Sequence, residues 1–322
     1  MELLRAESLR KYFEVRKAFR SGGSTLKAVD GIDFAISMDS VFALVGESGC
    51  GKSTVARLVL RLAEPTSGSV LFKGQNIFTL KRSEMKTFRR SVQIIFQDPF
   101  ASLNPRRTVL DTIAEPLIIH KIVPRSAMKD KVVEIIGDVG LGPETLNRYP
   151  HEFSGGQRQR ICIARALAVS PEVIVADEPL SALDVSIQAQ IINLLTDLKK
   201  RTKISFLFIS HDLRVVQYFS DNVGVMYLGK IVEHAATEEF FGKPFHPYSE
   251  VLLASAPKIK PPGEKKIRTA PLKGEVPSPI HIPPGCPFHP RCPKRFEPCD
   301  KIVPKLEENG GRLVSCHLWN PY

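Results

Sequence analysis

The feature that most constrains the fold of this 322-residue chain is a glycine-rich loop between a predicted strand and a predicted helix. The apolar run 40-SVFALVG-46 has the length and composition of a buried strand, and STVARLVLRL, which begins at Ser53, has helical periodicity. The loop between them, 46-GESGCGKST-54, contains the pattern G-x-x-x-x-G-K-S/T. A strand, a glycine loop and a helix in this order predict an α/β domain with a phosphate-binding loop at the end of the strand.

Each residue type in this loop suits a bound nucleotide. Glycines let the backbone N–H groups turn inward, Lys52 can reach the β- and γ-phosphates, and the Ser53 hydroxyl can ligate Mg²⁺. A glycine turn without a ligand is the alternative, and the flanking strand and helix argue against it. Cys50 is more typical of a small space-filling residue than of a reactive thiol. The residues predicted to bind ATP here are Gly46, Glu47, Ser48, Gly49, Cys50, Gly51, Lys52, Ser53 and Thr54.

The rest of the first 255 residues alternates between strand and helix patterns. Further buried strands are predicted at 92-VQIIF-96, 173-VIVAD-177, 204-ISFLFIS-210 and 223-VGVMYLG-229. A helix is predicted over 186–202, with Ser186 as its N-cap. This alternation predicts a mostly parallel central sheet. The segment from about Thr108 to Ala168 has helical periodicity with almost no strand pattern, which predicts a helical insertion.

Polar residues follow several of these strands. Asp177 and Glu178 end one strand, where Asp177 could hold Mg²⁺ and Glu178 could polarise an attacking water. Gln97 and His211 each follow another strand, and ligand contacts collect at these ends of α/β sheets. Gln97 is a candidate contact for Mg²⁺ or the water, and His211 a candidate hydrogen-bond donor to the γ-phosphate. Taken singly, each is more typical of a polar strand end, a turn or a helix cap, but together with the phosphate loop they favour a catalytic site.

A second glycine turn opens the predicted helix of 153-FSGGQRQRICIARAL-167. A turn at the positive end of a helix presents unpaired N–H groups, and phosphate is the usual anion bound there. The residues concerned are Ser154, Gly155, Gly156 and Gln157. They lie more than a hundred residues after the first loop, so one chain carries two phosphate-facing turns.

The last fifth of the chain differs in composition from the rest. Residues 256–322 hold 14 of the 25 prolines, four of the six cysteines and about half of the net charge of +11. We therefore divide the chain into a domain of residues 1–255 and a Pro/Cys-rich extension of residues 256–322. The sequence has no apolar run long enough for a membrane helix and no signal-peptide core, so a cytosolic protein is expected. The basic excess suits nucleic acid or an anionic membrane, and a solvated basic surface explains it equally well.

The four cysteines of the extension are Cys286, Cys292, Cys299 and Cys316. In a reducing cytosol, such a cluster favours metal ligation over disulfides. The spacing C-x5-C-x6-C-x16-C matches neither ferredoxin runs nor paired zinc knuckles. An iron–sulfur cluster, a zinc ion and free thiols all remain open at this point.

The order of the motifs resembles that of the ATPase subunits of ABC transporters, over residues 1 to about 240. These motifs are the phosphate loop, 97-QDP-99, 154-SGGQ-157, 173-VIVADE-178, 181-SALD-184 and 210-SHD-212. The resemblance implies a P-loop NTPase of ABC type, with a mostly parallel core sheet, an antiparallel N-terminal β part and a helical subdomain at about 108–168. It also implies that Phe13 stacks on adenine, and that Ser154 to Gln157 complete the nucleotide site of a second, head-to-tail ATPase subunit. Residues 181–184 would lie along that interface. Phe153 stands where leucine is commoner.

Nearly the whole chain resembles the oligopeptide and dipeptide importers, in particular the F-type of their two ATPase subunits. The motifs that carry this resemblance are 97-QDPFASLNPRRTV-109, 246-HPYSEVLLAS-255, 275-EVPSP-279 and 285-GCPFHPRCP-293. It implies a paralogous D-type ATPase partner, two membrane-spanning permease subunits and an extracytoplasmic solute-binding protein. It places the chain at the cytoplasmic face of the membrane, and it implies a [4Fe–4S] cluster on the four tail cysteines, with zinc as the alternative.

Other functions remain as alternatives. Relatives of this branch also move nickel or oligosaccharides. A soluble ABC ATPase acting on nucleic acid or in a cytosolic enzyme complex is a further alternative, but the chain has neither the tandem cassettes nor the long inserted domains that such proteins often carry. We therefore expect no nucleic-acid partner. A stand-alone P-loop kinase would leave 154-SGGQ-157 unexplained.

Overall fold

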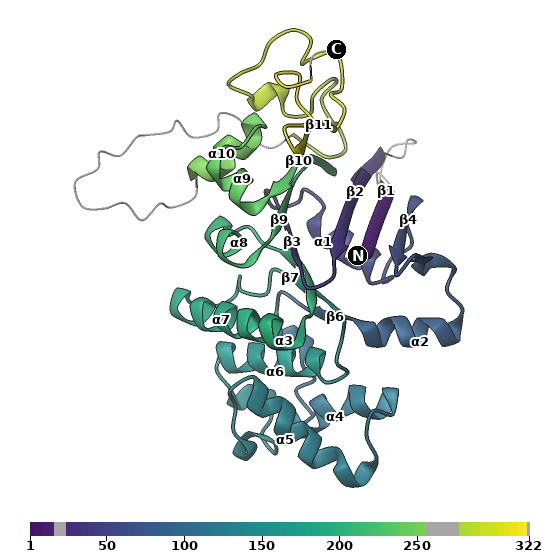
Figure 1. Ribbon diagram of the computed structural model, residues 1–322, viewed down its shortest axis with the longest axis vertical. Coiled ribbons are helices and arrows are strands. Elements are labelled where there is room, and N and C mark those ends of the chain that lie inside the picture. Colours follow the sequence, from purple (N-terminus) through teal and green to yellow (C-terminus); the bar gives the residue numbers. More distant parts are fainter. Residues whose placement is uncertain (16–23, 256–276, 321–322) are drawn as a thin grey trace, which may run out of the picture.

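A long mixed sheet runs through the computed structural model, which describes residues 1–15, 24–255 and 277–320 (Figure 1). Within these residues, the strand order of this main sheet is β11-β12-β10-β9-β3-β8-β7-β6. Its parallel part consists of β9 (Asn222–Tyr227), β3 (Val41–Val45), β8 (Ser205–Ile209), β7 (Val173–Asp177) and β6 (Val92–Ile95). These strands correspond to the apolar runs identified in the sequence, so the prediction of a mostly parallel core sheet is confirmed.

An antiparallel sheet formed by the N-terminal part of the chain lies beside the main sheet (Figure 1). Its strands are β2 (Ser24–Ser37), β1 (Glu2–Val15), β4 (Ser67–Phe72) and β5 (Gln75–Asn76), in that order. This sheet was implied by the family resemblance and not by any apolar alternation. The reason is visible in β1, whose register against β2 shifts several times and whose Ser8 has a φ of 44°. Such bulges break the two-residue period that a strand otherwise shows in its sequence.

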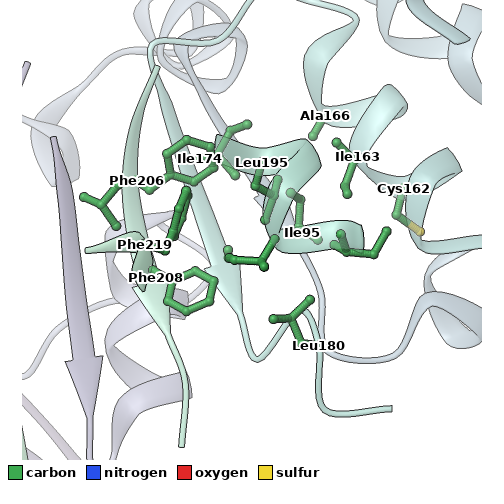
Figure 2. Packing of buried hydrophobic residues seen from close by; sticks show 14 of the residues in the cluster. Ile95, Cys162, Ile163, Ala166, Ile174, Leu180, Leu195, Phe206, Phe208 and Phe219 are labelled. Atoms are coloured by element: carbon green, nitrogen blue, oxygen red, sulfur yellow. The ribbon is translucent and has the colours of Figure 1, made fainter. Parts of the chain in front are cut away.

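Two hydrophobic cores lie on opposite faces of the main sheet. The alternation of β3 shows this directly, because Phe42 and Leu44 belong to one core while Ala43 and Val45 belong to the other. The first core also contains buried residues of α1 (Lys52–Val59), which packs between the two sheets. In the second core, Phe219 contacts the rings of Phe206 and Phe208, each at 5.2 Å between ring centroids (Figure 2). The glycine loop and its helix are thus held on a sheet buried on both faces.

The predicted helical insertion lies at one end of the molecule (Figure 1). It contains α4 (Val109–His120), α5 (Met128–Asp138) and α6 (Gly155–Leu167), with 3-10 turns at Arg125–Ala127, Pro143–Thr145 and Pro150–Glu152. The first of these helices begins after Thr108, whose hydroxyl accepts a hydrogen bond from the backbone N–H of Asp111. Between α1 and the insertion lie the helices α2 (Arg82–Ser91) and α3 (Pro99–Ser102), and a 3-10 turn covers Ile77–Thr79.

Later helices cover the main sheet near its parallel strands: α7 (Val185–Thr202), α8 (Leu213–Phe219), α9 (Thr237–Gly242) and α10 (Pro247–Ser255). The prediction that Ser186 caps the helix α7 is wrong, because the N-cap is Asp184. The side chain of Gln188 donates to the carbonyl oxygens of Leu180 and Leu183, so the turn before the helix is closed by a residue from inside it. No helix in the described residues is long and apolar enough to span a membrane.

The described part of the extension packs at the opposite end from the helical insertion (Figure 1). It contains a 3-10 turn at His289–Arg291 and the strands β11 (Glu307–Asn309) and β12 (Arg312–Val314). The strand β12 pairs antiparallel with β10 (Lys230–Ala236), so the C-terminal residues extend the main sheet. The predicted boundary at residue 256 lies outside the described residues.

Candidate functional site

The phosphate loop follows β3 and requires glycine at two positions. Gly46 has a φ of 151° and Gly51 a φ of 113°, backbone conformations that residues with a side chain rarely adopt. A Cβ atom on Gly46 would lie 2.2 Å from the Met226 carbonyl oxygen, and one on Gly51 would lie 2.1 Å from that of Ala28. The loop is therefore wedged against two neighbouring segments of backbone, which only glycine allows.

The lysine of the phosphate loop is buried, and its amino group contacts the backbone of the loop itself. Lys52 Nζ donates to the carbonyl oxygens of Gly46 at 2.8 Å and Glu47 at 3.0 Å. Lys52 Nζ also lies 3.8 Å from the Sγ atom of Cys50, and burial raises the pKa of that thiol. Cys50 is 5% exposed. Burial and a raised pKa agree with its interpretation as a space-filling residue.

Two candidate magnesium-binding groups meet beside the loop. Ser53 Oγ donates to Asp177 Oδ1 at 3.0 Å, which joins the start of α1 to the end of β7. Burial raises the pKa of the Asp177 carboxyl, the nearby charge of Glu178 raises it further, and the Ser53 hydrogen bond and the charge of Lys52 oppose this. A half-buried hydroxyl and carboxylate in contact suit a hard cation, which takes oxygen ligands and would neutralise that carboxylate.

The three residues predicted to act in catalysis are brought together at Glu178. Gln97 Nε2 donates to Glu178 Oε2 at 3.3 Å, and His211 Nδ1 lies 3.2 Å from the same oxygen. Glu178 has a φ of 47°, which a non-glycine residue adopts at a cost of about 1 kcal/mol. Its backbone N–H donates to the Ile209 carbonyl at 3.0 Å, so the two neighbouring strands β7 and β8 hold the strained conformation.

Gln97, Glu178 and the phosphate loop open onto one cavity, but neither His211 nor Asp177 is among its described lining residues. The described residues that line it are Phe13, Leu26, Ala28, Ser48, Gly49, Gly51, Lys52, Ser53, Thr54, Gln97, Glu178 and Pro279. Phe13 is 40% exposed, and Lys11 Nζ lies 5.1 Å from its ring centroid. Gly46, Glu47 and Cys50, which were also predicted to contact the nucleotide, are outside this lining. Pro279 was not predicted to line the cavity, because 275-EVPSP-279 indicated only the family resemblance.

The second glycine turn lies elsewhere on the surface. Ser154 and Gln157 form a capping box on α6, in which the Ser154 N–H donates to Gln157 Oε1 at 3.1 Å and the Gln157 N–H donates to Ser154 Oγ at 3.4 Å. A Cβ on Gly156 would lie 2.5 Å from Ile187 Cγ2, so this glycine allows α6 to approach α7. Ser154 and Gly155 are exposed, and residues 154–157 are absent from the described lining of the cavity at the phosphate loop.

The aromatic ring of Phe153 lies inside the fold, just before this turn. It is 4% exposed, and the Arg148 guanidinium lies 4.5 Å from its ring centroid. A larger side chain at this position is therefore accommodated by the core and leaves the exposed turn unchanged.

Two residues from the C-terminal part of the chain contact the phosphate loop at Glu47. The backbone N–H of Glu47 donates to Tyr248 Oη at 2.9 Å, and the Arg291 guanidinium donates to both carboxylate oxygens at 2.8 and 2.9 Å. Neither contact was predicted from the sequence. The only sign of them was that Tyr248 and Arg291 fall in 246-HPYSEVLLAS-255 and 285-GCPFHPRCP-293, two motifs of the family resemblance.

The four cysteines of the extension line one small cavity, together with His246 and His317. None of them forms a disulfide, and burial raises the pKa of Cys286 to about 12 and that of Cys316 to about 11. His246 is fully buried, its Nδ1 accepts from the Tyr248 N–H at 3.0 Å, and its Nε2 has no partner among the described residues. No group of three or more His, Cys, Asp or Glu side chains in the described residues is arranged to hold a metal ion, so the predicted metal centre is not confirmed.

Two family models match the chain. The ABC transporter model matches residues 29–181, and the model for the C-terminal region of oligopeptide/dipeptide transporters matches residues 232–299. The oligopeptide transport ATP-binding protein AppF of Bacillus subtilis is 48% identical over 321 residues, which are 99% of this chain and 98% of that protein. The dipeptide transport ATP-binding protein DppF of Escherichia coli is 44% identical, over 98% of this chain and 93% of that protein.

Solved structures agree with the fold. A dimeric post-hydrolysis structure of the ATP-binding cassette MJ0796 with ADP and Pi has a TM-score of 0.65 and 26% identity, over 73% of this chain and 99% of that chain. The structure of cbiO1 from Clostridium perfringens, part of the ABC transporter complex cbiONQ, has a TM-score of 0.64 and 27% identity, over 75% of this chain and 91% of that chain. From the full-length relatives we conclude that the chain belongs to the oligopeptide and dipeptide transport ATP-binding proteins, the ATP-hydrolysing subunits of ABC transporters.

Proposed function

We propose that this chain couples ATP hydrolysis to the uptake of oligopeptides or dipeptides, as a peripheral subunit at the cytoplasmic face of the cell membrane. The peptide substrate rests on the names of the full-length relatives AppF and DppF. The hydrolytic role rests on one observation above all, the meeting of Gln97 and His211 at Glu178 Oε2 beside the phosphate loop.

In this proposal each side chain has its own part. Glu178 is the base that takes a proton from the attacking water, and its strained backbone fixes where the carboxylate points. Gln97 and His211 orient that carboxylate, and His211, whose side chain is 60% exposed, can turn to donate to the γ-phosphate. Ser53, Asp177 and Gln97 would hold Mg²⁺, which neutralises charge on the phosphates when bound. Phe13 would stack on adenine, and Lys52 would leave its carbonyl partners for the β- and γ-phosphates.

Replacing Glu178 with glutamine tests this assignment. The change keeps the shape of the side chain and removes the base, so ATP should still bind while turnover falls by roughly 100-fold or more. The matched control is Glu172→Gln, at the amino end of the same strand, where Glu172 pairs with Lys73 on the surface. The control should turn over like the unchanged protein. Near-normal hydrolysis by Glu178→Gln, in the complex with its partners, would remove Glu178 from this role.

We also propose that Ser154, Gly155, Gly156 and Gln157 serve the nucleotide of a second ATPase subunit. Two observations support this: the turn is exposed and separate from the cavity of its own phosphate loop, and the cassette MJ0796 was solved as a dimer. The partners we propose are a paralogous D-type ATPase, two permease subunits and an extracytoplasmic binding protein. Purification from native membranes should recover all four partner chains with this one, and recovery of nucleic acid instead would contradict the assignment.

We propose further that Cys286, Cys292, Cys299 and Cys316 hold a [4Fe–4S] cluster. Four thiols bordering one cavity supply the ligand set, and the Nε2–H of His246 is a buried donor that a cluster sulfur could accept. The bound cluster would cross-link the tail. Zinc, which also takes four cysteine ligands, at about 2.3 Å, is the alternative metal.

Anaerobic purification tests the identity of the metal. The cluster predicts brown protein with four irons per chain and broad absorption near about 400 nm. Cys292→Ser should bleach it, whereas Cys162→Ser, at a buried cysteine in α6, should not. Colourless protein with one zinc per chain would decide for zinc, and metal-free protein with titratable tail thiols would reject both.

A further inference from the structure

The outer side of the phosphate loop is held by a side chain that lies 244 positions later in the sequence. Arg291 binds the Glu47 carboxylate through both terminal nitrogens, a two-bond geometry that is among the strongest side-chain pairs in proteins. The side chain of Arg291 is 5% exposed and that of Glu47 is 25% exposed, so water screens this pair weakly. The hydrogen bonds to Glu47 are also the main reason why the pKa of Arg291 is raised.

A second contact holds the backbone of the same residue. Tyr248 Oη accepts from the Glu47 N–H at 2.9 Å, and Tyr248 is fully buried. Its ring lies 4.7 Å from that of Tyr227 and 5.3 Å from that of Phe288, measured between centroids, so it has little room to move. Both the backbone and the carboxylate of Glu47 are therefore fixed from outside the loop.

The cysteine cavity sets where these two contacts lie. Arg291 is carried by the 3-10 turn between Cys286 and Cys292, in which the His289 N–H donates to the Cys286 carbonyl at 2.9 Å and the Cys292 N–H donates to the His289 carbonyl at 3.3 Å. Any change in the separation of these two cysteines must therefore move the turn. On the other side, Tyr248 lies two residues after His246, which lines the same cavity.

We propose that Arg291 and Tyr248 are positioning residues for the phosphate loop, so that assembly or opening of the cysteine cavity sets the affinity of this chain for ATP. Without Arg291, the Glu47 carboxylate is an unpaired negative charge next to a loop that binds phosphates, and it repels them. Because such coupling is reciprocal, bound ATP in turn stabilises the assembled cavity. The inference requires ATP binding at the phosphate loop and holds whichever metal, if any, occupies the cavity.

The primary test measures ATP affinity of the full-length chain in its transporter complex. Arg291→Met should weaken ATP binding about tenfold, within the usual range of coupling between sites. The matched control is Lys301→Met, which removes a cation of the extension that pairs with Glu297 on the surface and does not line the cysteine cavity, and should bind ATP normally. Unchanged affinity in Arg291→Met, or an equal loss in Lys301→Met, would overturn the proposal.

A rescue experiment separates positioning from simple support of the fold. In the Arg291→Met background, Glu47→Gln removes the unpaired charge and should recover most of the lost affinity. If the affinity stays low while Trp319 fluorescence shows a docked tail, the electrostatic argument fails. Tyr248→Phe removes only the hydroxyl, and it should weaken ATP binding several-fold with the aromatic packing retained.

A double-variant cycle tests the link to the cavity. Cys292→Ser should weaken ATP binding about as much as Arg291→Met, and the combined variant should be no weaker than either alone, because both act through one contact. Additive losses would overturn the coupling through Arg291. Iron and zinc content, measured on the same samples, reports separately on the metal assignment, so failure of that assignment does not decide this test.

Discussion

The buried carboxylate of Glu233 gives a sharp prediction about what holds the C-terminal extension in place. Glu233 lies on β10, is 0% exposed, and accepts hydrogen bonds from the N–H groups of Phe245 at 2.8 Å and His246 at 2.9 Å. Arg312 of the extension lies 3.9 Å from it. Glu233→Gln replaces one accepting oxygen with an NH₂ group, which is itself a donor. One of the two buried N–H groups, of Phe245 or of His246, then has no acceptor. An unsatisfied buried donor costs about 1–3 kcal/mol.

Part of this cost is offset. Burial raises the pKa of the Glu233 carboxyl, and the Ser249 hydroxyl, the two N–H donors and the charge of Arg312 act against this rise. Removing the charge therefore also removes a desolvation penalty. We therefore expect a net loss of about 1–2 kcal/mol in holding Phe245 and His246 in place, and with them Trp319 of the extension, which packs on Phe245. The matched control is Glu239→Gln. Glu239 lies 3.7 Å from the same Arg312 but is 44% exposed, and it should cost less than about 1 kcal/mol.

The chain contains one tryptophan, which reports on this contact directly. Trp319 stacks on Phe245 with 4.0 Å between ring centroids, and its Nε1–H donates to the Phe245 carbonyl at 2.7 Å. In urea, the Trp319 emission of Glu233→Gln should shift at a lower concentration than that of the unchanged protein, while the helical circular dichroism changes little. The hydrogen-bond argument is refuted if the urea midpoint of Trp319 emission is the same in Glu233→Gln as in the unchanged protein. It is also refuted if Glu239→Gln lowers this midpoint as much as Glu233→Gln does.

Three further predictions concern other parts of the chain. Burial of Asp30 raises its pKa, but the hydrogen bond from Tyr12 and the charge of Lys230 outweigh this and hold the pKa below the usual 3.8. Ionised Asp30 therefore stabilises the fold above pH 3.8, and this contribution is lost as the pH falls through the lowered pKa. In Asp30→Asn, the free energy of unfolding should depend less steeply on pH in that range. A Cβ added at Gly137 or at Gly74 would meet nothing within 4 Å, but Gly74 has a φ of 79°, which a residue with a side chain rarely adopts. Gly137→Ala, inside the helix α5, should therefore raise the free energy of unfolding by about 0.5–1 kcal/mol. Gly74→Ala should lower it by about 1 kcal/mol. Ser154→Arg should leave ATP binding by this chain intact and impair hydrolysis at the partner's phosphate loop, and loss of its own ATP binding would contradict the two-subunit arrangement.

The parallel strands of the main sheet were predictable because they are buried on both faces and appear as continuous apolar runs. The run 204-ISFLFIS-210 became β8, whose residues are all buried. The short strand β12 could not be found in this way, because Arg312–Val314 is three residues long and gains its place from pairing with β10. The N-cap of α7 was misassigned for a similar reason. Ser186 suits an N-cap by residue type, but the helix begins two residues earlier, with Asp184 as its N-cap, and the Gln188 side chain closes the preceding turn at Leu180.

At the site, residues that follow strands could be predicted because the sheet brings strand ends together. Gln97, Glu178 and His211 come from three segments of the sequence, and the order of β8, β7 and β6 makes them neighbours. Arg291 could not be predicted by this rule, because it belongs to a turn with no regular pattern. The nucleotide contact of its partner Glu47 stays a prediction, and the Glu47 carboxylate binds Arg291.

The extension is distinct in composition, but its described part packs as a piece of the ATPase fold. Cys286, Phe288 and Cys299 belong to the same hydrophobic core as the parallel strands, and β12 continues their sheet. Pro279 borders the cavity of the phosphate loop. Since the loop, the sheet edge and the core each have a contact in residues 277–320, the extension cannot shift without disturbing at least one of them. A chain segment with few apolar residues of its own can be held in this way only if something gathers it, and the cysteine cavity is lined by Cys286, Phe288 and Cys299, the same residues that join the core.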